Sequence, residues 1–263
     1  SIRNNSKALF HLGMIYFKGA LVNKNIYKGI HYLTISADQN NYDAMFLLGV
    51  IYYHGLDVER DVKKSIHYFK ELSSLNEFDS KNYLGVIYKN GDGVEKNIGY
   101  TIEYFNEAIK QKNYSYSMYN LARIYYFGIE IEKDLLKSIE LLEKASEKGL
   151  LLADLFLFFI FAFGDEKLRN EKKSSFHKQN FIKNIDFDYG IMFLTIKMRI
   201  GYDVTMKKLE QFFREYDLVF YSNMFNDLIL FLDENAIIKI EDDDQNKPIS
   251  RIVDQDFFDG FYH

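Results

Sequence analysis

The chain of 263 residues contains no cysteine, no tryptophan and only one proline. Without cysteine it forms no disulfide, has no thiolate nucleophile and binds no zinc through sulfur. With a single proline, long helices are rarely interrupted, and glycine is the main residue available to end them. The formal net charge of −5 is mild, so no basic excess attracts the chain to nucleic acid or to an anionic membrane.

A long apolar run is also missing. The most apolar stretch, residues 150–164, is shorter than the roughly 20 residues of a membrane-spanning helix, and Asp154 interrupts it. We interpret it as a buried helix and expect no insertion into a membrane. The first residues lack the pattern of a signal or transit peptide, but because the sequence begins without Met we expect this absence to say little about targeting.

What the chain does contain is an internal repeat. Leu12, Leu48, Leu84 and Leu121 stand 36, 36 and 37 residues apart, the first three followed by glycine and the fourth by alanine. A period of this length is typical of stacked helical hairpins. Each leucine has a small residue four positions before it, an isoleucine three after it and a tyrosine four after it. This spacing places them on one face of a helix. The small residues are Ala8, Ala44, Ser80 and Ser117, the isoleucines are Ile15, Ile51, Ile87 and Ile124, and the tyrosines are Tyr16, Tyr52, Tyr88 and Tyr125.

The glycines have two roles in this pattern. Inside a helix, glycine costs roughly 1 kcal/mol relative to alanine. The return of glycine at Gly13, Gly49 and Gly85 therefore predicts a close crossing with a neighbouring helix. A second set, expected to end each first helix in a left-handed cap, is Gly19, Gly55, Gly91 and Gly128.

A second helix is predicted after each capping glycine. An apolar residue stands three positions after the glycine, and we expect it to be buried under the loop as a plug. An Asn or Asp stands three positions further on and is suited to cap the N-terminus of the second helix. The plugs are Val22, Val58, Val94 and Ile131, and the caps are Asn25, Asp61, Asn97 and Asp134. The second helices carry Ile30, Ile66, Ile102 and Ile139, and two positions later Tyr32, Tyr68, Tyr104 and Leu141.

This pattern, A-x3-LG-x-I-Y-x2-G-x2-V-x2-[ND] followed by a second helix, resembles the Sel1-like repeat, which belongs with the tetratricopeptide-type α-solenoids. The resemblance covers roughly residues 5–164. It implies an all-α, right-handed superhelical solenoid of antiparallel helix pairs. It also implies roles such as adaptors in signalling or in membrane-associated degradation complexes. Because Ser1 replaces an initiator Met and Asn4 lies where a preceding repeat would end, we expect a longer protein.

Beyond residue 150 the motif fades while the period persists. Leu157 and Leu194 continue the leucine series, Gly164 stands in the cap slot, and Phe158 replaces the crossing glycine, so that the close crossing must open. We predict a degenerate fifth repeat with its second helix within residues 174–185, and a degenerate sixth over residues 188–216. The predicted organisation is a solenoid over 1–216, a capping helix over 217–233 and an acidic and aromatic tail over 234–263.

Several sequence motifs allow both a chemical and a structural interpretation. His31 and His67 occupy one slot of successive second helices, but Glu103 and Glu140 fill it next, which favours an exposed polar row over a metal pair. The Asn-Gly-Asp-Gly run at residues 90–93 lacks the ligands of a phosphate or calcium loop and indicates a helix-ending turn. The tail sequence DFFDGFYH either packs on the last helix or recognises another protein. Glycosylation triplets begin at Asn4 and Asn113.

Positions that vary among the repeats are the candidates for recognition. In the first helices, the slots two before the leucine and two, five and six after it lie away from the repeated face. In such solenoids the first helices usually line the concave side, where partners bind. The candidate partner-binding residues, called here the variable stripe, are Phe10, Met14, Phe17, Phe46, Val50, Tyr53, His54, Asn82, Lys89, Tyr119, Arg123 and Tyr126. The same slots also hold Lys18, Val86, Asn90 and Phe127. Aromatic residues and arginine anchor interfaces, but they also fill the space between repeats, and both interpretations stay open.

The sequence thus predicts a protein–protein interaction scaffold or adaptor that binds a partner peptide or helix on the concave face of the stack. It offers no nucleophile–base pair, metal constellation or nucleotide loop, so we predict neither enzymatic activity, a metal site nor a cofactor. The partners expected are other proteins, not nucleic acid. The alternatives are a lumenal adaptor of an ER-associated degradation complex and a regulatory segment of a larger enzyme. The compartment expected is the cytoplasm, with the ER lumen as the alternative; the oligomeric state is left open.

Overall fold

The structure is a computed structural model that describes residues 2–75, 77–184 and 214. Within these residues the secondary structure consists of ten α-helices and no strand, which confirms the all-α prediction. The helices are α1 (Ile2–Lys18), α2 (Ile26–Asp38), α3 (Tyr42–His54), α4 (Val62–Ser74), α5 (Phe78–Asn90), α6 (Ile98–Lys112), α7 (Ser115–Phe127), α8 (Leu135–Glu147), α9 (Leu151–Phe163) and α10 (Glu171–Asn184).

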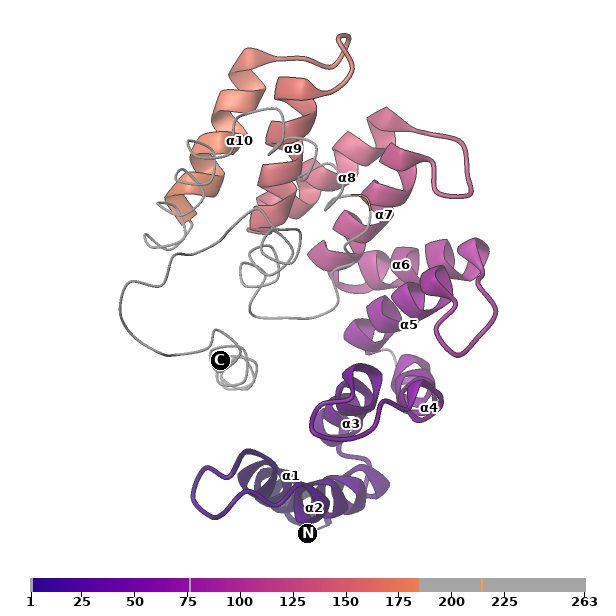
Figure 1. Cartoon of the computed structure of the whole chain (residues 1–263), viewed down its shortest axis with the longest axis vertical. Coiled ribbons are helices and arrows are strands. Elements are labelled where there is room, and N and C mark those ends of the chain that lie inside the picture. Colours follow the sequence, from indigo (N-terminus) through magenta and orange to yellow (C-terminus); the bar gives the residue numbers. More distant parts are fainter. Residues whose placement is uncertain (1, 76, 185–213, 215–263) are drawn as a thin grey trace, which may run out of the picture. The chain divides into compact units, whose positions relative to one another are not determined.

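The helices form hairpins within two units, Ser1–Lys112 and Asn113–His263. In the first unit α1 packs on α2, α3 on α4 and α5 on α6, and successive hairpins meet through α2 with α3 and α4 with α5. In the second unit α7 packs on α8 and α9 on α10, and α8 contacts α9. Figure 1 shows the two helices of each hairpin side by side, joined by a loop. Because the loops are short, the paired helices run antiparallel.

The crossing glycines lie against their own second helix. A Cβ built on Gly13 would stand 2.8 Å from Cγ of Leu33, and one on Gly49 would stand 2.6 Å from Cε1 of Phe69. A Cβ on Gly85 would meet the Phe105 ring in the same way. The predicted close crossing is therefore confirmed, and the structure identifies the side chain that requires it.

The predicted caps also form. Gly19, Gly55, Gly91 and Gly128 all have positive φ, between 66° and 76°. The Asn25 side chain accepts a hydrogen bond from the backbone N–H of Lys28 at 3.0 Å. Equivalent bonds, to residues three positions on, are made by Asp61, Asn97 and Asp134. Asn170, which the sequence analysis did not name, caps α10 by accepting from the Lys173 N–H at 2.9 Å.

The repeated tyrosines join the two helices of a hairpin. Tyr52 stacks on Tyr68 with ring centroids 6.4 Å apart and planes 4° apart, and the Lys64 ammonium lies 4.9 Å from the Tyr52 ring centre. The first, third and fourth hairpins repeat parts of this arrangement with Tyr16–Tyr32–Lys28, Tyr88–Tyr104–Tyr100 and Tyr125–Lys137. In the fifth hairpin the same three slots hold Phe161, His177 and Lys173, which make the same contacts. The fifth hairpin therefore preserves this packing although its motif has faded.

Three predicted details differ from the structure. Gly164 does cap α9, but with φ −68° and ψ −163° it is extended, not left-handed. Val22 is 40% exposed, so it does not plug the first loop, whereas Val58, Val94 and Ile131 are half-buried. The predicted helix within residues 174–185 corresponds to α10, which begins earlier because Asn170 caps it.

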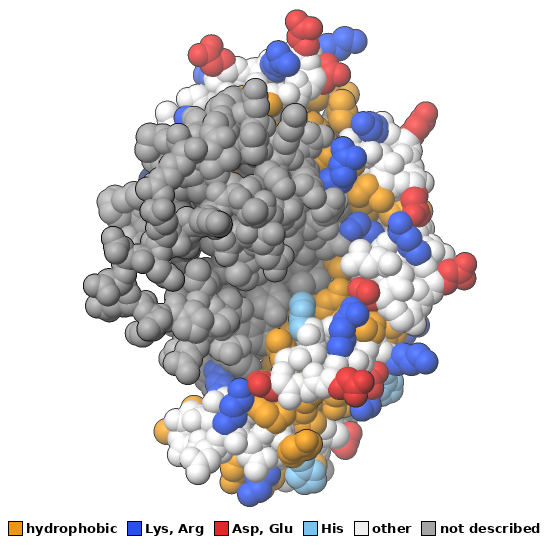
Figure 2. Space-filling view, in the orientation of Figure 1, with side chains coloured by type: hydrophobic (Ala, Val, Ile, Leu, Met, Phe, Trp, Pro, Cys, Tyr) orange, Lys and Arg blue, Asp and Glu red, His pale blue; other side chains and the backbone are white. Residues whose placement is uncertain are grey.

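Burial separates the first helices from the second. In α3 every residue from 44 to 51 is buried, as expected of a helix that is apolar on all sides. The second helix α4 buries one stripe, at Ser65, Ile66, Phe69 and Leu72. Figure 2 shows cationic and anionic side chains interspersed over the described surface of the face in view. Among the described residues, no helix combines the length and apolarity needed to cross a membrane.

Three predictions lie outside the described residues. They are the degenerate sixth repeat over 188–216, of which only Arg214 is described, the capping helix over 217–233 and the tail over 234–263.

Candidate functional site

The variable stripe lies on the four first helices α1, α3, α5 and α7, as the repeat register predicts. Ten of its twelve residues are buried, while His54 and Tyr126 keep part of their surface exposed. The buried members are Phe10, Met14, Phe17, Phe46, Val50, Tyr53, Asn82, Lys89, Tyr119 and Arg123. Most of the stripe is therefore already covered in this structure.

Three stripe residues of α3 surround one tyrosine of the following first helix. The ring centres of Phe46, Tyr53 and His54 lie 5.7, 5.6 and 6.1 Å from that of Tyr83 in α5. All three rings meet Tyr83 nearly edge-on, an arrangement that aromatic quadrupoles favour. Tyr83 itself is fully buried and stacks on Phe69 of α4 at 4.5 Å. These side chains fill the space between successive hairpins.

A similar cluster forms in the second unit, although there one of the three rings, Phe127, stacks on the central ring instead of meeting it edge-on. Tyr119, Tyr126 and Phe127 of α7 occupy the three equivalent slots, and their ring centres lie 6.2, 5.1 and 6.0 Å from that of Phe156 in α9. Phe156 occupies the same repeat slot as Tyr83. At both described places where the next first helix carries an aromatic residue at this slot, the aromatic residues of the stripe slots pack around it. Tyr126 and Phe127 are only half-buried, so they also present ring surface outwards.

A polar clamp continues the packing of α3 on the third hairpin. Asp92, in the turn after α5, accepts a hydrogen bond from the Tyr53 hydroxyl at 3.2 Å and pairs with the Arg60 guanidinium at 3.1 Å. Arg60 also donates from Nε to the Tyr53 carbonyl at 2.8 Å. Within the Asn-Gly-Asp-Gly turn, Gly91 and Gly93 have φ of 76° and 65°. The run is therefore a turn whose carboxylate joins two hairpins.

His54 contributes a neutral imidazole to this cluster. Burial, and secondarily the positive charge of Arg60, lower the pKa of His54 from 6.5 to about 4. At neutral pH the ring is uncharged and contributes aromatic surface to the stripe.

Arg123, the one arginine of the stripe, has no exposed surface. Its Nη2 donates a hydrogen bond of 2.7 Å to the main-chain carbonyl of Arg214, and its guanidinium lies 5.9 Å from the Tyr119 ring centre. The Arg214 guanidinium in turn lies 5.1 Å from the Phe127 ring centre. Sequence reasoning named Arg123 but had no signal for Arg214, which no repeat spacing links to α7.

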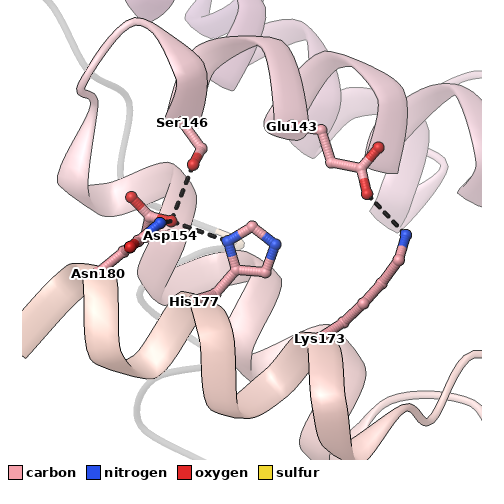
Figure 3. A network of polar contacts seen from close by, with 6 residues as sticks. All are labelled: Glu143, Ser146, Asp154, Lys173, His177 and Asn180. Atoms are coloured by element: carbon pink, nitrogen blue, oxygen red, sulfur yellow. Dashed lines mark hydrogen bonds and ion pairs between the residues drawn. The ribbon is translucent and has the colours of Figure 1, made fainter.

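A buried polar network joins the last three described helices (Figure 3). Oδ1 of Asp154 in α9 accepts a hydrogen bond from the Ser146 hydroxyl of α8 and lies 2.8 Å from Nδ1 of His177 in α10. The Asn180 amide approaches the same oxygen at 3.5 Å. Both Asp154 and His177 are buried.

The network brings together the residue types of a hydrolytic triad in a different order. In a triad the imidazole bonds the nucleophilic hydroxyl and the carboxylate orients the imidazole. Here the carboxylate of Asp154 lies between the Ser146 hydroxyl and the His177 ring, as Figure 3 shows. The arrangement fixes helices to one another and does not activate a nucleophile. Beside it, Lys173 pairs with Glu143 at 2.8 Å across the more exposed side of α8 and α10.

The slot that holds His31 and His67 is exposed, as the glutamates at the same slot of later repeats indicated. His31, His67, Glu103 and Glu140 are all exposed on the second helices. A pocket of about 610 Å³ beside His67 is lined by groups of both charges, including Asp38, Lys70 and Glu71. Over the described part of the chain, no three His, Cys, Asp or Glu side chains gather closely enough to hold a metal ion.

Comparison with protein families matches the model of the Sel1 repeat at residues 6–41, 43–77, 79–113 and 115–150. Together these matches cover more than half of the chain. Curated proteins give no match.

Two solved structures share the fold. A Sel1 repeat protein from Oxalobacter formigenes is 22% identical with a TM-score of 0.63, over 81% of this chain and 88% of that one. The protein c5321, a protective antigen of uropathogenic Escherichia coli strains with an SLR fold, is 21% identical with a TM-score of 0.59. That match covers 79% of this chain and 44% of the antigen. At this level of identity the likeness concerns the fold alone.

Proposed function

The chain belongs to the Sel1 repeat family, and from this we propose that it is a protein–protein interaction scaffold. Sel1 repeat proteins generally mediate contacts between proteins, and their fold is typically not enzymatic. The four matched repeats supply the stacked hairpins from which such a surface is built.

We place the partner on the variable stripe, where a peptide or a helix would lie along the first helices. The observation that carries this proposal is the pair formed by Tyr126 of the stripe and its neighbour Phe127, which stands in one of the same slots; both keep exposed surface while anchored on Phe156. Aromatic rings held rigidly at a surface are typical anchors of interfaces. One slot of the second helices instead presents a row of charged and polar residues to solvent, for example His67 and Glu103.

Photo-crosslinking tests the placement without disturbing the core. A photoreactive benzoylphenylalanine in place of Tyr126 is expected to form adducts with the partner in the native host. The same group in place of Tyr100, which is 50% exposed on the second helix α6, serves as the control. Adducts from position 126 and none from position 100 support the placement of the partner on the stripe. Equal adducts from both, or adducts from position 100 alone, would contradict it.

Glycan mapping on the native protein tests the lumenal alternative. The Asn113 triplet lies on an exposed turn before α7, where φ of Asn113 is 50°. The Asn4 triplet falls in α1, where Ser6 is buried and its carbonyl accepts a hydrogen bond from Ser36. A glycan at Asn113 favours the lumenal adaptor, whereas an unmodified Asn113 favours the cytoplasm.

A further inference from the structure

The contact between Arg123 and Arg214 joins two residues that lie 91 positions apart in one unit. The donor is a guanidinium with no exposed surface, and the acceptor is a main-chain carbonyl at 2.7 Å. The side chain of Arg214 turns to the Phe127 ring at 5.1 Å and remains exposed. Two groups of Arg214, its carbonyl and its guanidinium, are therefore held by two residues of the same helix.

The helix geometry explains why these residues act together. Tyr119, Arg123 and Phe127 follow one another at intervals of four in α7, so their side chains lie along one face. Arg123 lies against the Tyr119 ring at 5.9 Å, which helps to fix the direction of its donors. A planar guanidinium has five N–H donors, and burying it is costly unless acceptors are supplied. A carbonyl from another segment is such an acceptor.

The two contacts differ in what they select. A main-chain carbonyl is present at every residue, so the bond from Arg123 recognises backbone whatever the sequence. The contact with Phe127 selects a cation, because the ring face attracts a guanidinium or an ammonium group. Together they recognise a cationic residue within a peptide segment, which in this chain is an arginine.

We propose that Tyr119, Arg123 and Phe127 form a binding site for an arginine-bearing peptide segment, and that its occupant in this chain is the segment carrying Arg214. The proposal rests on the proposed function, since it places an internal ligand on the stripe where a partner would bind. A partner that uses this end of the stripe then has to present an arginine in the same way and displace the internal segment.

Tethering gives the internal segment a large advantage. A segment joined to its site by a short flexible linker acts at an effective concentration on the order of 1 mM, and a longer linker lowers this value. A free peptide of equal intrinsic affinity competes with the internal segment. Its apparent affinity is the intrinsic affinity multiplied by the fraction of sites that the internal segment leaves empty. Removing the internal arginine is therefore expected to raise the affinity for a free arginine peptide about 10-fold or more.

A peptide-binding experiment on the full chain tests this expectation. The probe is a fluorescein-labelled peptide of residues 207–221, KKLEQFFREYDLVFY, and the readout is fluorescence anisotropy. The Arg214→Glu chain is expected to bind it about 10-fold more tightly than the wild-type chain does. Arg199→Glu, the same charge change elsewhere in the C-terminal third, is the control and is expected to match the wild type. A probe in which the arginine is replaced by glutamate is expected not to bind.

A second measurement reports the internal contact directly. Benzoylphenylalanine in place of Phe127 keeps an aromatic ring at the site and is expected to crosslink to a peptide containing residue 214. Mixing ¹⁴N-labelled and ¹⁵N-labelled chains separates the sources, because an internal contact gives only crosslinks of a single label. Crosslinks of mixed label would make a second copy the occupant and overturn the proposal.

Equal binding of the probe by wild-type and Arg214→Glu chains, with no crosslink to residue 214, also overturns the proposal. Neither measurement uses an outside partner. If the internal binding site is disproved, the partner adducts at position 126 remain an independent result. Failure of the internal site can therefore be told apart from failure of the proposed function.

Discussion

At the scale of single residues, the crossing glycines show how one missing methyl group sets the distance between two helices. The sequence predicted a close neighbour from the recurrence of Gly13, Gly49 and Gly85 in helices. It did not identify that neighbour, because the partner slot holds either leucine or phenylalanine and carries no fixed residue. The structure places Leu33, Phe69 and Phe105 in that slot.

Replacing Gly49 by alanine is expected to destabilise the protein although alanine is the better helix former. Alanine gains about 1 kcal/mol in helix propensity. Its Cβ would stand 2.6 Å from Cε1 of Phe69, whose fully buried ring stacks on Tyr83. Overpacking of a tight core costs typically 1–3 kcal/mol, so we expect a net loss on the order of 1 kcal/mol in the urea-unfolding free energy. Gly99→Ala, at an exposed position in the first turn of α6, is the control. A loss in the control equal to that of Gly49→Ala would argue against the crossing explanation.

His54 makes the stability depend on pH. The pKa of His54 is about 4 in the folded chain and about 6.5 when unfolded, because burial and Arg60 disfavour its charged form. Between these values the unfolded state binds more protons, so stability is full above pH 6.5 and is lost as the pH falls towards 4. We expect a loss on the order of 2 kcal/mol between pH 7 and pH 5 from this group. His54→Gln should remove that part of the pH dependence in urea titrations, and His67→Gln, at an exposed position, should not.

At the scale of elements, the hairpin was the most predictable part of the structure. Helix periodicity, glycine caps and Asn or Asp N-caps act within a few residues, so their signals are local and lie in the sequence. The stacks such as Tyr52 on Tyr68 follow from the same register. The fifth hairpin could be predicted by continuing the repeat period, although Phe158 replaces the crossing glycine there. Its partner slot then holds Lys178, which is exposed, so the tight crossing is absent at that point.

Contacts between hairpins were less predictable. Each aromatic cluster forms around Tyr83 or Phe156, residues that the repeat motif does not specify. The stripe was identified by its variation, and variation alone does not separate a residue that binds a partner from one that fits its neighbour. The network around Asp154 was also missed, because Ser146 and His177 are distant in sequence and none of the other four described hairpins repeats the arrangement.

The Asp154–His177 pair is expected to behave as a coupled unit. The fourth hairpin carries buried Met118 and Leu141 in the same two slots. His177→Leu alone leaves the buried carboxylate without its imidazole and is expected to cost about 3 kcal/mol. The double change Asp154→Met with His177→Leu copies the apolar pair of the fourth hairpin and is expected to recover most of that loss. A double-mutant cycle of unfolding free energies measures the coupling.

The exposed ion pair beside the network is the control for that cycle. Glu143→Gln removes the partner of Lys173, and surface pairs contribute about 1 kcal/mol or less. Additive effects of the Asp154 and His177 changes would show that the pair is not a unit.

At the scale of the whole molecule, stability is expected to accumulate hairpin by hairpin. In repeat proteins each hairpin contacts only its neighbours, and no single core joins all of them. The first unit follows this rule, since its contacts run from α1 to α6 in chain order. The clamp of Arg60 and Tyr53 on Asp92 adds a polar link from the second hairpin to the third.

The first unit is therefore expected to fold without the second. A chain of residues 1–112 keeps three complete hairpins and the covered faces of α3 and α4, and about three repeats are the minimum for a stable stack. We expect a helical circular-dichroism spectrum and a cooperative thermal transition. A chain of residues 1–96 ends before α6 and lacks Phe105, which packs against Gly85. This shorter chain should therefore melt at a lower temperature. Residues 1–75 keep two hairpins and lose the Tyr83 cluster, and they should melt without a sharp transition. Gradual melting of 1–112, or equally sharp melting of all three chains, would show that stability does not accumulate along the hairpins in this way.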